Sequence, residues 1–262
     1  MNWWEGLLLG FIHGVLEFLP ISSTGHLFVL NKWLEGSESF LFLHIASLLA
    51  AIVYFRHDCK NIMYDFFLYI CTKKQEAKSN YQVGLLILFS TMITLTAGNI
   101  FKLLIETQTT NALIGASSIL TGIFLVLTEH GVEIGRKKAQ HINWKDAIII
   151  GLGQALAFIP GFSRTGSTLI TALWCGFDKE TALRYSFLIS IPTIGGICLL
   201  QMPPMSSSHS SIPFLILLFS FLTAFFCSLL GIRLLISIVR HTKLTYVAFY
   251  CFSFGLVVWL FI

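Results

Sequence analysis

Long apolar stretches alternate with short charged segments along the whole chain. Six of these stretches contain no Asp, Glu or Lys, and each is long enough to cross a bilayer as a helix, which takes about 17 to 25 residues. They cover residues 39–55, 81–101, 112–128, 182–201, 213–232 and 244–262. The pattern predicts an all-α polytopic membrane protein with six transmembrane helices.

Two further apolar stretches, residues 3–34 and 147–176, are broken near their middle by Pro, Gly and polar residues. The breaks read Pro20-Ile-Ser-Ser-Thr-Gly-His26 and Pro160-Gly-Phe-Ser-Arg-Thr-Gly-Ser-Thr168. Irregular backbone is tolerated at membrane depth only where protein or water surrounds it. We therefore expect two re-entrant helix pairs, with the chemistry of the protein at their breaks.

Composition narrows the class of protein. The chain is 55% apolar and only 11% charged, whereas soluble domains average about 25% charged residues. This excludes a soluble globular enzyme, a disordered chain and a coiled coil. The net charge of +4 does not indicate a nucleic-acid partner, because the basic residues lie between apolar stretches, as membrane insertion requires. The N-terminus lacks the basic start of a cleavable signal peptide, so we expect it to be retained.

Lys and Arg predict the orientation in the membrane. Fourteen of the seventeen lie in the segments 56–80, 129–146, 177–184 and 233–243. By the positive-inside rule these segments are cytoplasmic. Threading six spans through them places both termini outside, with residues 3–34 entering from the outer side and 147–176 from the cytoplasmic side.

The two halves share one plan at an offset of about 140 residues. Trp4, Gly10 and Phe18-Leu-Pro20 match Trp144, Gly151 and Phe158-Ile-Pro160. We expect a single integral membrane domain, residues 1–262. It divides into repeat 1 at about 1–128, a cytoplasmic linker at about 129–146 and repeat 2 at about 147–262. An odd number of crossings gives the repeats inverted topology, which places a site near the midplane where the breaks meet.

Charged side chains within a membrane are costly and indicate function. Glu17 lies in the first break and Arg164 in the second, so the inverted repeat would bring them together. They could form a purely structural ion pair, but the turns also carry many hydroxyls and glycines. Loop N–H groups and an Arg fork match an oxyanion such as phosphate. The predicted phosphate-binding residues are Ser22, Thr24, Gly25, Ser163, Thr165, Gly166, Ser167 and Thr168.

Three histidines near the breaks are further candidates. His13 and Glu17 share one helix face at i, i+4 and could hold a divalent cation; alternatively, His13 forms a hydrogen bond within the bundle. His26 could deprotonate Ser23 or water, or protonate a leaving phosphate; alternatively, it is structural. His44, inside the apolar stretch 39–55, is interpreted as structural rather than as support for the site. Glu17, Ser23, His26 and Arg164 are the predicted catalytic residues.

The segments Glu17–His26 and Pro160–Thr168 resemble the two signature motifs of the bacterial undecaprenyl-diphosphatase (bacitracin-resistance) family. Tyr185–Pro192 is similar to the stretch that follows the second motif. The resemblance covers essentially the whole chain. It implies hydrolysis of the polyprenyl lipid undecaprenyl diphosphate to undecaprenyl phosphate and inorganic phosphate. This would recycle the carrier of peptidoglycan precursors at the outer face of the bacterial plasma membrane and confer bacitracin resistance.

The resemblance also implies roles for individual residues. Glu17 corresponds to the essential acid of the family, Ser23 and His26 to its motif Ser and His, and Ser163, Arg164 and Thr168 to its phosphate-binding residues. It further implies Mg²⁺ or Ca²⁺ as cofactor and a homodimer. Two carboxylates of the family are missing here, because His13 replaces one Glu and Phe40–His44 lacks the other. This weakens a site for a hard cation, which prefers oxygen ligands.

Two mechanisms and one rival function stay open. Either Ser23 attacks the substrate with His26 as base, or Glu17 with a metal ion activates water. The rival function is a polyprenyl-phosphate flippase using the same pocket, because inverted repeats with broken helices are typical of transporters. A structural subunit would not explain the paired polar breaks.

Overall fold

The computed structural model describes residues 2–32, 41–105, 110–131, 135–200 and 213–262. Within these residues every element is helical, apart from an isolated bridge between Lys137 and Phe177. The predicted all-α class is confirmed. Parts of the predicted elements lie outside the described residues, namely 33–34, 39–40, 132–134, 201 and the connection 202–212.

Both broken segments are pairs of helices, as predicted. The first consists of α1 (Trp3–Glu17) and α2 (Ser23–Asn31). The second consists of α7 (Trp144–Ala155), the 3₁₀ turn η4 (Leu156–Phe158) and α8 (Arg164–Trp174). Each pair places its break at the Pro-containing turn, because Pro removes a backbone donor and fixes φ.

The first helices of the two pairs begin with the same capping box. At α1 the Asn2 side chain accepts from the Glu5 N–H at 2.9 Å, and the Glu5 carboxylate accepts from the Asn2 N–H at 2.8 Å. At α7 the Asn143 side chain accepts from the Asp146 N–H at 3.1 Å, and the Asp146 carboxylate accepts from the Asn143 N–H at 2.8 Å. The reciprocal bonds satisfy donors that a helix start leaves unpaired. The shared cap is a local feature that the two proposed repeats have in common.

Six further helices provide the candidate spans. They are α3 (Leu41–Tyr54), α5 (Lys78–Ile105), α6 (Asn111–Gly131), α9 (Lys179–Leu200), α10 (Phe214–His241) and α11 (Leu244–Phe261). Within the described residues, five are long and apolar enough to cross a membrane, and α3 reaches that length only together with α4 (Arg56–Thr72), to which it is bent by 78°. Counting this bent pair as one span gives the six that the sequence predicts.

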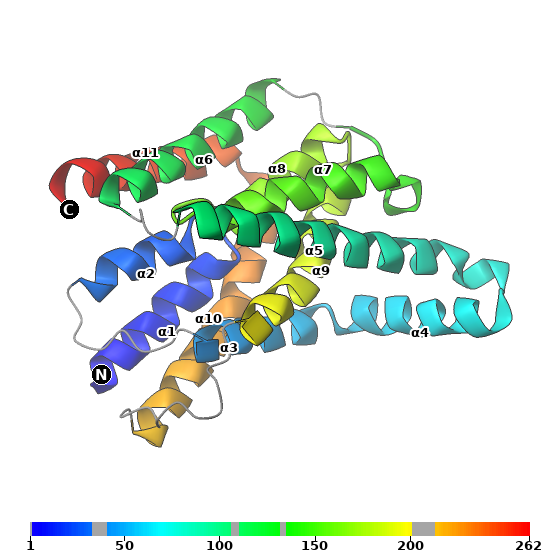
Figure 1. Cartoon of the computed structure of the whole chain (residues 1–262), viewed down its shortest axis with the longest axis horizontal. Coiled ribbons are helices and arrows are strands. Elements are labelled where there is room, and N and C mark those ends of the chain that lie inside the picture. The colour runs from blue at the N-terminus through cyan, green and yellow to red at the C-terminus, as the bar shows by residue number, and fades with distance from the viewer. Residues whose placement is uncertain (1, 33–40, 106–109, 132–134, 201–212) are drawn as a thin grey trace.

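The segment 56–80, which we expected to be a cytoplasmic loop between two spans, is mostly helical. It forms α4 and the 3₁₀ turn η1 (Gln75–Ala77), and α4 lies beside the start of α5 (Figure 1). Tyr81 packs its ring against Phe66 and Tyr69, with centroids 5.2 and 4.6 Å apart. The many charged residues of this segment mark it as hydrophilic, but charged residues are compatible with an exposed helix.

Small residues allow close helix packing at the centre of the bundle. A Cβ atom added to Gly14 of α1 would lie 2.5 Å from the Ala224 carbonyl oxygen of α10. One added to Gly151 of α7 would lie 2.8 Å from the Ser90 carbonyl oxygen of α5. Such contacts are typical of helix pairs in membranes. In each pair the first helix of one predicted repeat packs against a long helix of the other: α1 against α10, and α7 against α5. Inverted repeats would produce this arrangement, although the repeat itself stays a prediction.

Both chain termini lie at the same end of the helix bundle, while the connection from α4 to α5 lies at the opposite end (Figure 1). An even number of membrane crossings requires this arrangement of the termini. The side of the membrane that each end faces is a separate prediction, taken up below.

Candidate active site

The two breaks lie against each other and are joined by hydrogen bonds. The Ser163 hydroxyl donates to the Leu19 carbonyl oxygen at 3.1 Å, and the Thr165 hydroxyl donates to the Glu17 carbonyl oxygen, also at 3.1 Å. Gly161 adopts φ +99°, a backbone conformation that glycine tolerates best. The turn before α8 is thereby held against the turn before α2.

The second helix of each pair starts with the same serine cap. The Ser22 hydroxyl accepts from the Gly25 N–H, and the Ser163 hydroxyl accepts from the Gly166 N–H, each at 3.1 Å. Serine is a favoured N-cap because it satisfies an unpaired N–H of the first turn. Helix N-termini carry partial positive charge, so an anion is favoured beside them.

An ion pair joins the two breaks. Arg164 Nη2 lies 2.7 Å from Glu17 Oε1, and the two side chains are 11% and 6% exposed. The Ser23 hydroxyl donates to Glu17 Oε2 at 2.5 Å. The expectation that the acid and the guanidinium meet is confirmed, and each carboxylate oxygen has its own partner.

These polar groups lie in the wall of a cavity of about 360 Å³. Glu17, Ser23, Thr24 and Arg164 contribute to its polar part. Much of the remaining wall is apolar, including Ile21, Phe158, Pro160, Phe162, Ile197 and Leu200. A cavity lined by both charged and apolar side chains suits a ligand that has both a charged and an apolar part.

Three polar or ionisable residues of the cavity wall were not predicted for the site. Asn99 and Lys102 come from the last two turns of α5, and His44 comes from α3. Lys102 could have been found from the sequence, because it is a cation directly after the long apolar stretch 81–101. His44 is an ionisable residue within an apolar helix, which by itself indicates function.

Most of the predicted phosphate-binding hydroxyls bond to the backbone instead. Thr165 bonds as described above, Ser167 donates to the Ser163 carbonyl oxygen at 2.8 Å, and Thr168 donates to the Arg164 carbonyl oxygen at 2.6 Å. Of the eight predicted phosphate-binding residues, Thr24 alone is among the residues that line the described cavity. The N–H groups of Gly25 and Gly166 are used by the serine caps. A direct contact of these groups with phosphate stays a prediction.

His26 lies apart from the Ser23–Glu17 pair. Its Nδ1 is 2.7 Å from the Ser22 carbonyl oxygen, and its Nε2 is 2.8 Å from the Tyr250 hydroxyl. A carbonyl oxygen only accepts, so Nδ1 carries the proton and, in the neutral ring, Nε2 accepts from Tyr250. The ring also stacks on Phe254 with centroids 3.7 Å apart. With this geometry the partner of the Ser23 hydroxyl is Glu17 rather than His26.

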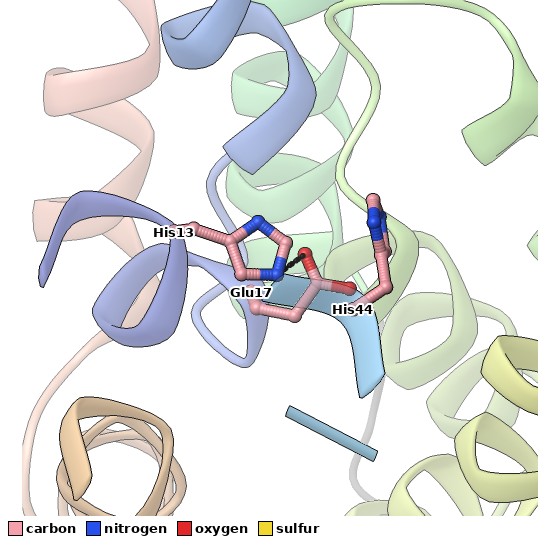
Figure 2. A group of neighbouring side chains, drawn as sticks. All are labelled: His13, Glu17 and His44. Carbon is pink, nitrogen blue, oxygen red and sulfur yellow. Dashed lines mark ion pairs between the residues drawn. The ribbon is translucent and has the colours of Figure 1, made fainter. Parts of the chain in front are cut away.

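His13 and His44 flank the carboxylate of Glu17, as Figure 2 shows. All three residues are buried, and one ligand atom from each lies within 4.8 Å of the others. The donor set is two imidazoles and one carboxylate. Mg²⁺ and Ca²⁺, which the resemblance implies, take six or more ligands that are mostly oxygen. This cluster of two imidazoles and one carboxylate does not fit Mg²⁺ or Ca²⁺. No catalytic step is therefore assigned to either ion.

Comparison with known proteins decides the family. The family model described as bacitracin resistance protein BacA matches residues 6–257, nearly the full length of the chain. The chain belongs to the BacA family. The resemblance inferred from the two motifs is confirmed, and the two breaks that form the site lie inside the matched region.

Relatives of this BacA family chain carry diphosphatase names. Undecaprenyl-diphosphatase 2 of Halalkalibacterium halodurans is 40% identical over 261 residues, which cover 97% of this chain and 94% of that protein. Undecaprenyl-diphosphatase 1 of Shouchella clausii is 38% identical over 268 residues, covering 100% and 97%. Undecaprenyl-diphosphatase of Alkaliphilus metalliredigens is 34% identical over 273 residues, covering 100% and 99%. The similarity extends over whole chains, so the described fold corresponds to theirs.

Proposed function

We propose that this BacA family protein is an enzyme that hydrolyses undecaprenyl diphosphate to undecaprenyl phosphate and inorganic phosphate. Family membership and the names of the relatives support this reaction. The structural observation that carries it is the contact of Ser23 and Arg164 with opposite oxygens of Glu17, at 2.5 and 2.7 Å, in the cavity wall. The reaction recycles the carrier lipid for peptidoglycan synthesis and thereby confers bacitracin resistance.

The cavity accounts for both parts of the substrate. The diphosphate lies at the polar end, where the guanidinium of Arg164 presents parallel N–H donors to phosphate oxygens. Lys102, Thr24 and the N-termini of α2 and α8 add positive charge or donors around the same space. The polyprenyl chain leaves along the apolar wall toward the bilayer.

Ser23 is the nucleophile in this proposal and Glu17 its base. The Ser23 oxygen attacks the terminal phosphorus while its proton passes to Glu17 along the 2.5 Å hydrogen bond. The bond from phosphorus to the bridging oxygen breaks, and undecaprenyl phosphate leaves. Water then attacks the phosphoserine, and the bond from phosphorus to the Ser23 oxygen breaks. The Ser23 oxygen recovers the proton from Glu17, and inorganic phosphate leaves as dihydrogen phosphate with both hydrogens of the water. Arg164 stabilises the charge that develops on the transferred phosphoryl group.

A one-step route uses the same residues. Water held near Ser23 would attack the terminal phosphorus and give its proton to Glu17, and no phosphoserine would form. Ser163, Thr165, Ser167 and Thr168 act in either route as positioning residues, because their hydroxyls hold the turn that presents Arg164. His26 has a similar positioning role through Ser22 and Tyr250.

The orientation proposed for the protein places the cavity on the outer side of the bacterial plasma membrane, with both termini outside. The excess of Lys and Arg in the segments 56–80, 129–146, 177–184 and 233–243 supports this. The cavity extends to Ile105 and Leu200, the last residues of α5 and α9. The connections that follow these helices are not among the Lys- and Arg-rich segments, so threading the spans places them on the outer side. A homodimer stays a prediction.

Phosphate release from undecaprenyl diphosphate by the purified protein in detergent tests the function. The proposal expects steady release of inorganic phosphate, and rapid quenching followed by mass spectrometry should detect phosphate on Ser23. Release without phosphoserine would favour the one-step route. Binding of the lipid with no release would contradict the enzyme and favour the flippase, which no observation here supports over the phosphatase.

A further inference from the structure

His13, Glu17 and His44 bring three metal-binding side chains to one point. His13 and Glu17 lie one turn apart on α1, and His44 comes from α3, which packs beside it. The carboxylate of Glu17 lies between the two imidazoles (Figure 2). One ligand atom from each residue lies within 4.8 Å of the other two. The cluster is therefore a converging donor set rather than three scattered buried polar residues.

His13 gives an independent reason to expect a ligand. Its side chain is 0% exposed, and neither ring nitrogen makes a hydrogen bond of good geometry with the described residues, although the Leu43 backbone lies beside the ring and the His44 ring packs edge-on against it at 4.8 Å. His13 Nε2 lies 3.9 Å from Glu17 Oε2, which is too far for a hydrogen bond. Buried polar groups without partners are rare in native proteins and call for an explanation. A metal ion bound to the imidazole would supply the missing partner.

We propose that His13, Glu17 and His44 bind a divalent first-row transition metal ion of the kind represented by Zn²⁺, Co²⁺ or Mn²⁺. Imidazole nitrogen favours these ions over Mg²⁺ and Ca²⁺, which prefer oxygen. Two His and one carboxylate are also the ligand set of a zinc site with one position left open.

Metal binding requires the cluster to close. Ligand atoms about 2.1 Å from a tetrahedral ion lie about 3.4 Å apart, compared with 3.9 Å between His13 Nε2 and Glu17 Oε2 and up to 4.8 Å across the three residues. Arg164 contacts Glu17 Oε1, so the guanidinium and the ion do not compete for one atom. The ion would share Oε2 with the Ser23 hydroxyl, which donates to it at 2.5 Å. Glu17 and His44 line the cavity, and the open coordination position therefore faces it.

This metal site rests on donor geometry and does not depend on the proposed hydrolysis, because binding is measured without substrate. The protein purified in detergent is treated with a chelator and titrated with Co²⁺ alone, whose visible absorption reports nitrogen and oxygen ligation. We expect one Co²⁺ per chain by elemental analysis. Stoichiometric Zn²⁺ should displace it, whereas a thousandfold excess of Mg²⁺ or Ca²⁺ should not.

Variants locate the bound ion. His13→Gln and His44→Gln should each weaken Co²⁺ binding by about tenfold or more, since even indirect support of a metal ligand is worth about that much. His57→Gln is the matched control, because His57 is an exposed histidine of α4 outside the cluster, and it should bind as the unaltered protein does. His13→Glu should still bind metal, with its preference shifted toward Ca²⁺ by at least tenfold.

Thermal unfolding in the absence of substrate separates a metal site from simple packing of two histidines. The metal hypothesis expects Co²⁺ to raise the Tm of the unaltered protein and of His57→Gln, and not that of His13→Gln. The proposal is overturned if the folded protein shows no visible Co²⁺ absorption, or if equal concentrations of Mg²⁺ displace the ion. It is also overturned if His13→Gln and His44→Gln bind Co²⁺ like the unaltered protein.

Discussion

The guanidinium of Arg164 lies 2.7 Å from the carboxylate of Glu17, although 147 residues separate them along the chain. Glu17 is the last residue of α1 and Arg164 the first residue of α8. The pair therefore joins the two broken segments at the points where their helices stop and start. A buried ion pair at such a junction fixes the relative position of the two turns, and here it also lies in the cavity wall.

Arg164→Lys should lower the turnover of undecaprenyl diphosphate by about 10²-fold or more, the usual cost of losing one transition-state donor. Lysine keeps the charge but lacks the planar fork that binds two phosphate oxygens together. Steady-state phosphate release measures the change. Arg184→Lys is the control, because Arg184 pairs with Asp58 outside the cavity lining. Near-normal turnover of Arg164→Lys would argue strongly against a guanidinium clamp.

Ser22 and Ser23 are neighbours with different expected roles. Ser23→Ala should lower turnover by at least about 10³-fold, as loss of a nucleophile does, with little change in thermal stability. Ser22→Ala removes the N-cap of α2 and should cost about 1 kcal/mol of stability while keeping much more activity. Turnover and the denaturation midpoint of both variants give the comparison. If Ser23→Ala turns over normally, the covalent route is excluded.

Tyr250→Phe tests whether His26 positions the first turn. The substitution removes the hydroxyl that bonds to His26 Nε2 at 2.8 Å and leaves the rest of the ring. We expect a moderate loss of both turnover and stability, about 1 kcal/mol for the stability, and His26→Ala should lower both further. A base at position 26 predicts a different pattern, in which His26→Ala abolishes turnover at unchanged stability and Tyr250→Phe has no effect.

Gly14→Ala tests the close approach of α1 and α10. The added Cβ would lie 2.5 Å from the Ala224 carbonyl oxygen, so the helices must separate at a cost of about 1 to 3 kcal/mol. Gly195→Ala in α9 is the control, because the nearest atom to its added Cβ is 4.0 Å away. Removing this helix glycine should raise stability slightly. Equal Tm values for the two variants would contradict the described packing.

The main features of the fold were predictable because membrane physics restricts the choices. Apolar stretches of bilayer length and breaks at Pro20 and Pro160 led to the spans and the two helix pairs. The meeting of Glu17 and Arg164 followed from the cost of charge in a membrane together with the repeated plan. The sequence analysis did not predict α4, because the charged residues of the segment 56–80 indicate a hydrophilic connection. The ring contacts of α4 with Tyr81 are not visible in the sequence.

Side-chain partners in the site were harder to predict than the elements. Tyr250, which bonds to His26, lies 224 residues further along the chain, so no local pattern reports the contact. Whether His44 faces the site depends on the rotation of α3 about its axis, which a uniformly apolar helix does not reveal. The sequence analysis interpreted the hydroxyls of the turn after Pro160 as phosphate ligands. Hydroxyls also form hydrogen bonds to nearby backbone groups and so stabilise turns. The sequence alone does not distinguish these two roles.

The most direct test of the proposed function is phosphate release from undecaprenyl diphosphate by Glu17→Gln beside the unaltered protein, both purified in the same detergent. Glutamine keeps the shape of the side chain but accepts no proton from Ser23. We expect the folded variant to bind the lipid and to release phosphate about 10²- to 10⁴-fold more slowly, the range for loss of a general base. Release at the unaltered rate would show that the chemistry does not depend on Glu17.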